Sequence, residues 1–386
     1  MNQDEIELSR AKIGKYEPPK QSTQSQAITK KRKPQEIKKE EPMFKFEVPT
    51  IKYNQLIGMK RQKAILHKLL ELPLTKPLEF QQLGVKRSIG ILLYGPPGTG
   101  KTFLCKACCG ELNVKMCYIT PTSIMSKYVG ESASKVHQVF FEAYKNMPCA
   151  IFIDEADVLL QKRDDISSEG GSNELKQAVS QMLVETSLIH DDKKSHIYLL
   201  GATNTPWTID PAHKRSGRFE YLLYIKGPSF MDRRKLFKLY LGQENSDFKQ
   251  YFGKINYTLL AMASADYSPA DCEKICKIAL INAIEHKRVL VTTRSVQNAF
   301  WSKEGGKSSL DPWYLEMWQK YLVKNKSIIK SIISKNYREK EDPKSKLDKS
   351  EMEIYKELIQ DVQRHQNHKW YIALIRLLGR GFPNLV

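Results

Sequence analysis

The stretch that decides the fold reads Ile89-Gly-Ile-Leu-Leu-Tyr94-Gly95-Pro-Pro-Gly-Thr-Gly-Lys-Thr102. A short apolar run, typical of a buried strand, leads directly into a glycine-rich loop, and a helical stretch follows. The loop matches G-x-x-x-x-G-K-[ST] in the strand–loop–helix setting that this phosphate-binding pattern requires. We expect Lys101 to reach the β- and γ-phosphates of a nucleotide and Thr102 to hold Mg²⁺ through its hydroxyl. A glycine-rich turn that matches by chance is the alternative.

Two further strand ends carry polar residues suited to the same chemistry. The apolar run 149–153 ends in Asp154 and Glu155, and a carboxylate at the end of a buried strand is costly without a charged partner. Beside a phosphate loop, we expect Asp154 to meet the Mg²⁺ shell and Glu155 to polarise the attacking water as general base. Asn204, after the run 196–203, is placed to orient that water, although an asparagine after a strand is more often a turn residue.

The order of apolar runs predicts the fold class. Near-continuous aliphatic and β-branched runs separated by helical stretches indicate an α/β fold, a parallel five-stranded P-loop sheet with helices on both faces. After Pro228 only helical patterns follow, which predicts a small all-helical domain appended to the sheet domain; Ser268 is expected to cap one helix, with Pro269 and Asp271 in its first turn. The expected strands are 88–95, 115–120, 149–154, 196–203 and 220–225, and the expected helices of the small domain are 230–241, 257–265, 269–286 and 293–300.

Composition bounds the remaining classes. The chain has 386 residues and a formal charge of +19, but basic and acidic residues are interleaved along it rather than gathered in one tail. Nucleic acid is therefore a possible partner but not the favoured one. No apolar run is long enough to span a membrane, and the first residues are too acidic for a secretory signal. Seven unevenly spread cysteines indicate reduced thiols, so we expect a cytoplasmic location.

A series of further motifs, in a fixed order, carries a family resemblance. The motifs occupy residues 72–77, 80, 83–84, 95–102, 130–132, 153–157, 201–204, 210–212 and 217–219. With these motifs, the chain is similar to an AAA ATPase of the branch that contains katanin, spastin, the vacuolar-sorting ATPase and valosin-containing protein. The resemblance covers about residues 43–325 and implies ATP and Mg²⁺ as cofactors, a lid domain and a ring, usually a hexamer, that pulls protein substrates through a central pore.

The resemblance also assigns roles outside the phosphate loop. Lys127, Tyr128 and Val129 resemble the first pore loop, with Tyr128 gripping an extended polypeptide, although a lone exposed tyrosine would normally mean nothing. Arg215 and Arg218 stand at the paired arginine-finger positions. An arginine supplied by the neighbouring subunit would stabilise the charge that develops on the γ-phosphoryl group. A role within the same subunit, or a plain surface turn, is the alternative.

The resemblance further implies a nucleotide pocket, in which this chain departs from the family pattern. Gln55 stands where an acid is usual, Tyr240 replaces a histidine of the lid near the adenine, and Pro269 replaces the glycine of a Gly-Ala-Asp motif. None of these departures touches the phosphate chemistry. The residues expected to bind the nucleotide are Gly58, Gly95, Pro96, Pro97, Gly98, Thr99, Gly100, Lys101, Thr102, Phe103, Tyr240 and Ala270.

The sequence thus predicts four parts: a flexible polar arm (1–42), an AAA α/β domain (43–228), a lid domain with a C-terminal helix at 310–324 (229–325), and a helical C-terminal extension (326–386). The leading hypothesis is an ATP-hydrolysing motor that remodels protein substrates, recruited directly or through an adaptor. A nucleic-acid-associated ATPase that acts on DNA-bound complexes and a nucleotide-gated assembly module are the alternatives. The sequence does not name the substrate.

Overall fold

A computed structural model of the chain describes residues 43–84, 90–126, 128, 130–162, 166, 172–192, 195–215, 217–241, 252–285, 291–302, 308–310 and 313. The predicted arm at 1–42 and the extension at 326–386 lie outside the described residues, as does most of the C-terminal helix predicted at 310–324. The four-part division of the chain stays a prediction. None of the helices in the described ranges is both long and apolar enough to cross a membrane.

A parallel five-stranded sheet forms the centre of the α/β part, as the sequence predicts. Every strand lies within an expected apolar run, and the observed ends differ from the expected ones by two residues at most. The order across the sheet is β2-β3-β4-β1-β5, so the phosphate-loop strand β1 lies between β4 and β5. The strands are β1 (Gly90–Tyr94), β2 (Lys115–Ile119), β3 (Cys149–Ile153), β4 (Ile197–Thr203) and β5 (Tyr221–Tyr224).

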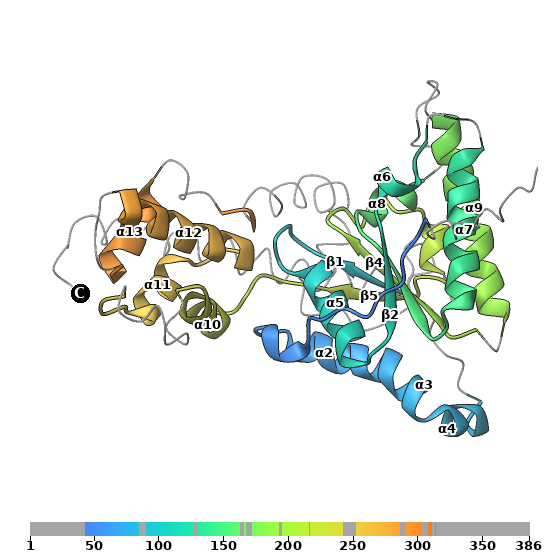
Figure 1. The fold of residues 1–386 in the computed structure, drawn as a ribbon, viewed down its shortest axis with the longest axis horizontal. Coiled ribbons are helices and arrows are strands. Elements are labelled where there is room, and N and C mark those ends of the chain that lie inside the picture. Colours follow the sequence, from blue (N-terminus) through green and yellow to red (C-terminus); the bar gives the residue numbers. More distant parts are fainter. Residues whose placement is uncertain are drawn as a thin grey trace, which may run out of the picture. The chain divides into compact units, whose positions relative to one another are not determined.

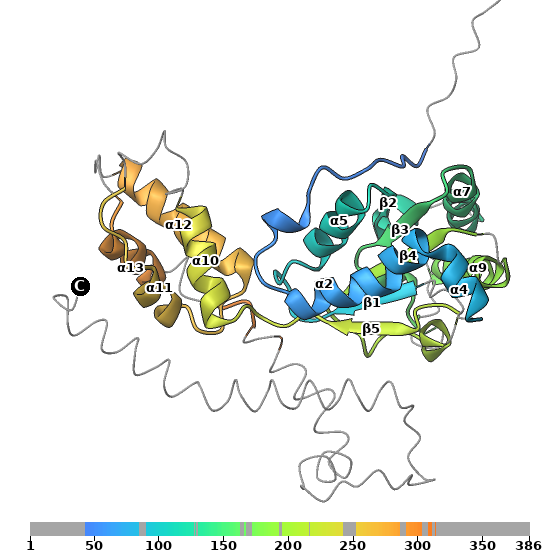
Figure 2. The same ribbon diagram turned by 90° about the horizontal axis from the view of Figure 1, so that it is seen from below.

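Helices cover both faces of this sheet (Figures 1 and 2). Because alternate strand residues point to opposite faces, Ile151 belongs to one core and Phe152 to the other. The first core packs the sheet against α7 (Glu131–Lys145), α8 (Ala156–Leu159) and α9 (Ser172–Asp191). The second packs it against α2 (Lys60–Leu66), the π-helical turn η2 (His67–Glu71) and α5 (Lys101–Glu111). Shorter elements are η1 (Tyr53–Gln55), α6 (Pro121–Ile124) and η4 (Pro211–Lys214).

The register of the strands places the predicted site residues at one edge. Tyr94, the last residue of β1, lies opposite Thr203 of β4, and Ile153 of β3 lies opposite Gly201 of the same strand. The loop that begins at Gly95, the carboxylate of Asp154 and the amide of Asn204 therefore all follow strand ends on the same side of the sheet.

The predicted lid helices are also present and pack around their own core. Ser268 accepts a hydrogen bond from the Asp271 amide at 3.1 Å, and Asp271 accepts one from the Ser268 amide at 2.9 Å. This reciprocal cap matches the start that the sequence predicts. The helices are α10 (Phe230–Tyr240), α11 (Tyr257–Ala263), α12 (Pro269–Glu285) and α13 (Thr293–Trp301).

Sequence reasoning did not assign the helical stretch from α2 onward. After η2 come α3 (Leu72–Thr75) and α4 (Pro77–Gln82). Pro73 lies in the first turn of α3, and α4 begins at Pro77. Proline is compatible with the first turn of a helix but interrupts a longer helical pattern in the sequence. The pattern therefore does not reveal the series of short helices that the structure contains.

Candidate functional site

The glycines of the loop 95–100 are required by its backbone. Gly95 has φ +147°, and a Cβ there would lie 2.2 Å from the carbonyl oxygen of Ile225. Gly98 has φ +72°, and its Cβ would lie 2.8 Å from the Ser268 hydroxyl. Only glycine combines these conformations with such close neighbours. The loop ends at the N-terminus of α5, where unpaired N–H groups and the helix dipole favour a bound anion.

Lys101 is the first residue of α5; its side chain packs against this loop, and the residue is 8% exposed. Its ammonium group donates hydrogen bonds to the carbonyl oxygens of Gly95 (3.0 Å) and Pro96 (2.8 Å) and to the side-chain oxygen of Asn204 (2.7 Å). Burial lowers the pKa of Lys101 to about 8, against the opposing attraction of Asp154 and Asp157. The loop therefore holds a compact cation in a position to bind phosphate oxygens. Burial makes the charged form of this group less favourable than it is in water.

A hydroxyl and a carboxylate meet beside Lys101. Thr102 Oγ1 donates to Asp154 Oδ2 at 3.0 Å. This pair offers two hard oxygen ligands next to the phosphate loop, which fits the donor preference of Mg²⁺. Thr102 and Asp154 would hold that ion together with the phosphates, and the ion would neutralise charge that develops on them.

Tyr118 is a neighbour of this pair that sequence reasoning missed. Its hydroxyl donates to the same Asp154 Oδ2 at 2.7 Å. Burial first, and then the hydrogen bond and charge of Asp154, raise the pKa of Tyr118 to about 12, so it stays a donor. The residue lies in β2, and no motif marks it. The only available signal is its place near the end of a strand next to β3.

Glu155 follows Asp154 in a strained conformation. Its φ is +48°, in the left-handed region that a residue with a side chain seldom adopts, and its amide donates to Asp154 Oδ1 at 3.1 Å. The residue is exposed. The turn thus directs two adjacent carboxylates differently: Asp154 into the Thr102 contact and Glu155 toward solvent, where a water nucleophile is accessible.

The end of β4 adds a second polar layer. Asn204 reaches Lys101, as described above, and Thr203 donates to Asp157 Oδ1 at 2.6 Å. Asp157 belongs to the family motif, but its partner is visible only in three dimensions. Because Asp157 attracts the Lys101 cation, it raises the pKa of Lys101 and helps to keep the ammonium group protonated.

A cavity of about 730 Å³ extends from the phosphate loop toward the lid. Gly98, Thr99, Gly100 and Phe103 line it from the loop side, and Tyr240 and Ala270 from the lid side. Gln55 lines it as well, so all three departures from the family pattern, including Pro269, border this one cavity. Burial raises the pKa of Tyr240, which therefore offers a neutral ring and hydroxyl. The cavity fits a largely apolar ring system joined to phosphates.

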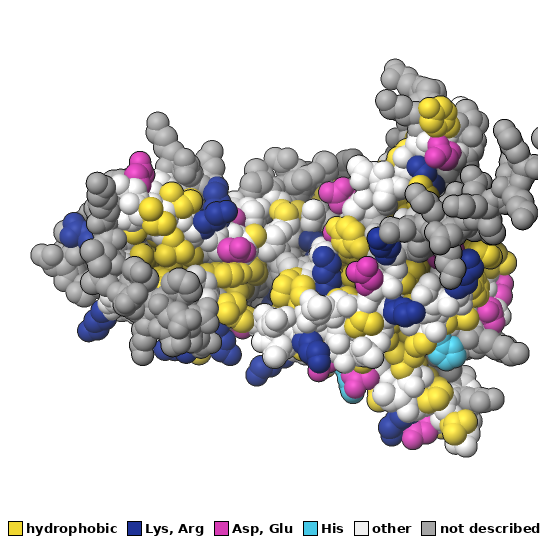
Figure 3. Space-filling model, viewed as in Figure 1, with side chains coloured by type: hydrophobic (Ala, Val, Ile, Leu, Met, Phe, Trp, Pro, Cys, Tyr) yellow, Lys and Arg dark blue, Asp and Glu magenta, His cyan; other side chains and the backbone are white. Residues whose placement is uncertain are grey.

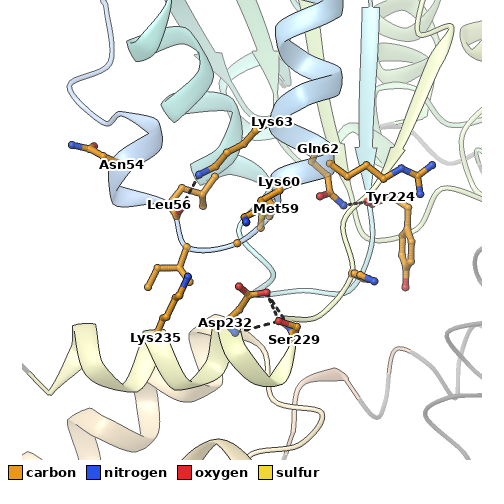
Figure 4. Close-up of a pocket in the computed structure, with 14 residues that line it drawn as sticks. Asn54, Leu56, Met59, Lys60, Gln62, Lys63, Tyr224, Ser229, Asp232 and Lys235 are labelled. Carbon is orange, nitrogen blue, oxygen red and sulfur yellow. Dashed lines mark hydrogen bonds between the residues drawn. The ribbon is translucent and has the colours of Figure 1, made fainter.

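Gly58 borders a second cavity of about 790 Å³, which shares Asn54, Leu56, Ile57 and Met59 with the first (Figure 4). A Cβ on Gly58 would lie 2.9 Å from the Asp232 carboxylate carbon, and Asp232 in turn caps α10 through Ser229. Figure 4 shows Asp232 and Ser229 on the lid side, facing the loop that carries Met59 and Leu56. Gly58 therefore lies at the contact with α10 rather than in the first cavity.

The two arginines expected as fingers differ in their contacts. Arg218 donates to the Ala212 carbonyl (2.7 Å) and to the Ser187 hydroxyl (2.9 Å), whereas Arg215 is exposed. Burial, and then the charge of Arg215, lower the pKa of Arg218, against the attraction of Asp210. The Arg218 carbonyl oxygen would lie 2.3 Å from a Cβ on Gly90. Arg218 thus borders the start of β1, at the opposite end of that strand from Gly95.

The residues of the expected pore loop are only partly described. Tyr128 is 75% exposed, while Lys127 and Val129 lie outside the described residues. The loop is fastened on its C-terminal side, where the Gly130 amide donates to Glu174 Oε1 at 2.9 Å. An aromatic side chain is thus held out from the surface on an anchored loop.

All seven cysteines are buried free thiols. Burial raises the pKa of Cys108 to about 11 and that of Cys117 to about 12, so both remain protonated at neutral pH. Charge on the face drawn in Figure 3 is mixed, with Lys and Arg side chains interspersed with Asp and Glu. Neither feature points to redox chemistry or to a dedicated nucleic-acid surface on this face.

Comparison with known proteins agrees with this geometry. Residues 91–227 match the ATPase family associated with various cellular activities (AAA). The chain is 36% identical to a proteasome-activating nucleotidase of Saccharolobus islandicus over 265 residues, which is 68% of this chain and 65% of that protein. It is 35% identical to the peroxisomal ATPase pex6 of Schizosaccharomyces pombe over 65% of this chain and 26% of that protein.

A third relative is the cell division cycle protein 48 homolog of Archaeoglobus fulgidus, 34% identical over 69% of this chain and 34% of that protein. The matched segment therefore spans about two thirds or less of each of these relatives. The segment of this chain that matches the AAA family includes the phosphate loop, Asp154, Glu155 and Asn204.

Proposed function

We propose that this chain, of which residues 91–227 match the AAA family of ATPases, hydrolyses ATP with Mg²⁺ to drive the remodelling of protein substrates. The observation that carries the proposal is the convergence of Lys101, Asp154 and Asn204 at one edge of the sheet. One relative is named a proteasome-activating nucleotidase and another a peroxisomal ATPase, and the first of these names supports a protein rather than a nucleic-acid substrate.

The chemistry follows from the groups at that edge. Lys101 and the loop amides bind the β- and γ-phosphates, while Thr102 and Asp154 hold the metal ion. Asn204 orients a water molecule, and the Glu155 carboxylate takes a proton from it as its oxygen attacks the γ-phosphorus. The bond to the β-phosphate oxygen then breaks, which leaves ADP and phosphate. The cavity beside Phe103 and Tyr240 receives the adenine.

We propose that Arg215 completes this site from a neighbouring protomer. Arg218 borders Gly90, and the run from Gly90 to Gly95 measures about 16 Å at ~3.3 Å per strand residue, which is longer than an arginine side chain extends. Arg218 is therefore too distant to reach the γ-phosphate of its own chain without a large rearrangement, which supports a role for this segment at a neighbouring site. Arg215 is exposed and therefore available to a neighbour, and Arg218 holds the turn that presents it. A site completed in this way is a head-to-tail contact, which makes a ring if the rotation between protomers closes and a spiral or filament if it does not.

The ring is proposed to be a hexamer with Tyr128 facing its pore. A 75% exposed tyrosine on a fastened loop suits transient grip on an extended polypeptide, with Lys127 and Val129 on either side of it in sequence. The protein substrate would arrive directly or through an adaptor. Seven unbridged cysteines support the proposed cytoplasmic location.

The test combines turnover with substrate capture. Purified protein should release phosphate from ATP only with Mg²⁺, and the Glu155→Gln variant should retain ATP and trap substrate proteins for identification. Basal turnover that is absent at all protein concentrations would contradict the ATPase. Turnover stimulated by DNA and lost at high salt, with no trapped protein, would favour the nucleic-acid alternative.

A further inference from the structure

Trp313 contacts the main chain of Asn204 directly. The indole Nε1–H of Trp313 donates to the Asn204 carbonyl oxygen at 2.7 Å, and the side chain is 4% exposed. The side-chain oxygen of the same Asn204 accepts the 2.7 Å hydrogen bond from Lys101. Asn204 is therefore held through its backbone by Trp313, while its side chain contacts Lys101 at the phosphate loop.

The indole ring is fixed by an aromatic stack. Trp313 stacks on Tyr224 with ring centroids 6.5 Å apart and planes 19° from parallel. The ring of Trp207 also contacts Trp313, and the centroids of these two rings are 6.4 Å apart. Tyr224 stacks in turn on Tyr94 at 5.3 Å. Tyr94 is the residue directly before Gly95, so the stack extends from Trp313 to the start of the phosphate loop. A ring packed in this way leaves the indole N–H little freedom to point elsewhere.

The residues just before Trp313 are fastened to the lid. Ser309 donates to Asp271 Oδ2 from its amide (3.0 Å) and from its hydroxyl (2.7 Å), and its hydroxyl also lies 3.0 Å from the Ser268 hydroxyl. Asp271 and Ser268 cap α12, and the Ala270 amide beside them donates to the Gly98 carbonyl at 3.4 Å. A short piece of chain thus contacts the lid at Ser309 and the end of β4 at Trp313.

We propose that Trp313 is a positioning residue that holds Asn204 in register with Lys101 and links its position to that of the lid helix α12. If the lid moves, Ser309 moves with the α12 cap, and Trp313 transmits the displacement to the Asn204 main chain. This inference rests on the proposed function, because it assigns Trp313 a role through the residue that orients water. It also extends that function, since it makes turnover sensitive to a residue outside the α/β part of the chain.

The first test separates the hydrogen bond from the packing. Trp313→Phe keeps an aromatic ring in the stack and removes the N–H donor. It should lower kcat for ATP about fivefold, the effect expected for the loss of one hydrogen bond, and change KM less than twofold. The matched control is Trp207→Phe, which removes an indole N–H from the same cluster and should leave kcat within twofold. Equal losses in the two variants would overturn the role of Trp313.

A double-mutant cycle tests whether the effect passes through Asn204. Asn204→Ala removes the amide side chain but keeps the carbonyl that Trp313 contacts. In this background Trp313→Phe should cause no further loss of kcat, because the group that it positions is gone. Additive losses would show that Trp313 acts by another route and would overturn the inference.

A third measurement does not depend on turnover, so it distinguishes failure of this inference from failure of the proposed function. The Thr205 amide donates to Thr203 Oγ1 at 2.9 Å, next to Asn204. Amide hydrogen exchange at residues 203–205 should become at least several-fold faster in Trp313→Phe, with unfolding temperature unchanged. Should that variant fail to fold, Ser309→Ala removes the two hydroxyl contacts of the other anchor and should also make this exchange faster. Unchanged exchange in a folded variant would overturn the proposal, whether or not the wild-type protein hydrolyses ATP.

Discussion

Lys101 and Asn204 lie 103 positions apart in the sequence, yet the ammonium group of one donates a 2.7 Å hydrogen bond to the side-chain oxygen of the other. The bond joins the phosphate loop after β1 to the end of β4. It exists because these two strands are neighbours in the sheet, with Tyr94 opposite Thr203. Because of this bond, a displacement of the end of β4 would change the position of the Lys101 ammonium group, which would bind the γ-phosphate.

The charge of Lys101 predicts a pH dependence of catalysis. Burial lowers the pKa of Lys101 to about 8, so the free enzyme loses this cation as pH rises through 8. Because phosphate binding needs the cation, kcat/KM for ATP should be constant below about pH 8 and fall above it. The profile of kcat should bend at a higher pH, since bound phosphate stabilises the charged form. A kcat/KM profile that is flat to pH 10 would contradict this account.

The same pKa predicts how stability varies with pH. Between about pH 8 and the ordinary lysine value of 10.5, the unfolded chain keeps a proton that the folded Lys101 has released. The unfolded state then binds more protons, so this group makes the free energy of unfolding increase as pH rises through that window. Denaturant unfolding of the nucleotide-free protein, compared with Lys101→Met, measures the effect. The variant should lack this rise, and an identical pH dependence in both proteins would argue against a buried cation.

Glu155→Gln should separate binding from hydrolysis. The substitution keeps the size of the side chain but removes the group that accepts the proton from water. Turnover should fall by about 10²- to 10⁴-fold while ATP affinity stays within a few-fold of the wild-type value. Single-turnover phosphate release and equilibrium nucleotide binding measure the two quantities. If turnover remained near normal, Glu155 would not be the base.

Arg215→Ala should be inactive alone but rescued by mixing. Loss of a finger arginine is expected to lower kcat by about 10³- to 10⁵-fold without weakening ATP binding. Mixed with inactive Lys101→Ala protomers, some sites would pair an intact loop with an intact finger, and activity should return. No activity at any mixing ratio would contradict a finger supplied by the neighbour. Arg218→Ala is the comparison: it should also lower thermal stability, because Ala212 and Ser187 lose a donor.

Tyr128→Ala should abolish substrate remodelling and leave basal ATP turnover within about twofold, because the side chain is 75% exposed and stabilises little of the fold. Tyr128→Phe, which keeps the ring, should retain most remodelling. ATP turnover, and the unfolding of a substrate first identified with the Glu155→Gln variant, are measured on the same preparation. Full remodelling by Tyr128→Ala would contradict the pore-loop assignment.

Gly98→Ala tests the contact of the phosphate loop with the lid. The φ of +72° costs a residue with a side chain about 1–2 kcal/mol, and the new methyl group would lie 2.8 Å from Ser268 Oγ and 3.0 Å from Ala270 Cβ. ATP affinity should fall at least tenfold, with a smaller loss of stability. The control is Gly84→Ala, which also has a positive φ but no neighbour within 4 Å. If Gly98→Ala and Gly84→Ala lowered ATP affinity equally, the loss would be due to backbone strain and not to the contact with the lid.

Much of this protein was predictable from the sequence because the deciding signals are local. An apolar strand, a glycine-rich loop and a helix start occupy consecutive residues, so Lys101 and Thr102 could be assigned roles without a fold. The strand pattern and the Ser268 cap are local for the same reason, and both are confirmed. The series of short helices after Lys60 was missed because Pro73 and Pro77 interrupt its pattern.

Tertiary structure alone decided which residues touch. Pairing of strands distant in sequence brings Asn204 to Lys101 and Tyr118 to Asp154, and side-chain packing brings Trp313 to the Asn204 carbonyl. Neither Tyr118 nor Trp313 belongs to a motif. Local sequence determines backbone conformation and the chemistry of each side chain, whereas the partners of a buried side chain depend on strand order and packing, which are set by the whole chain.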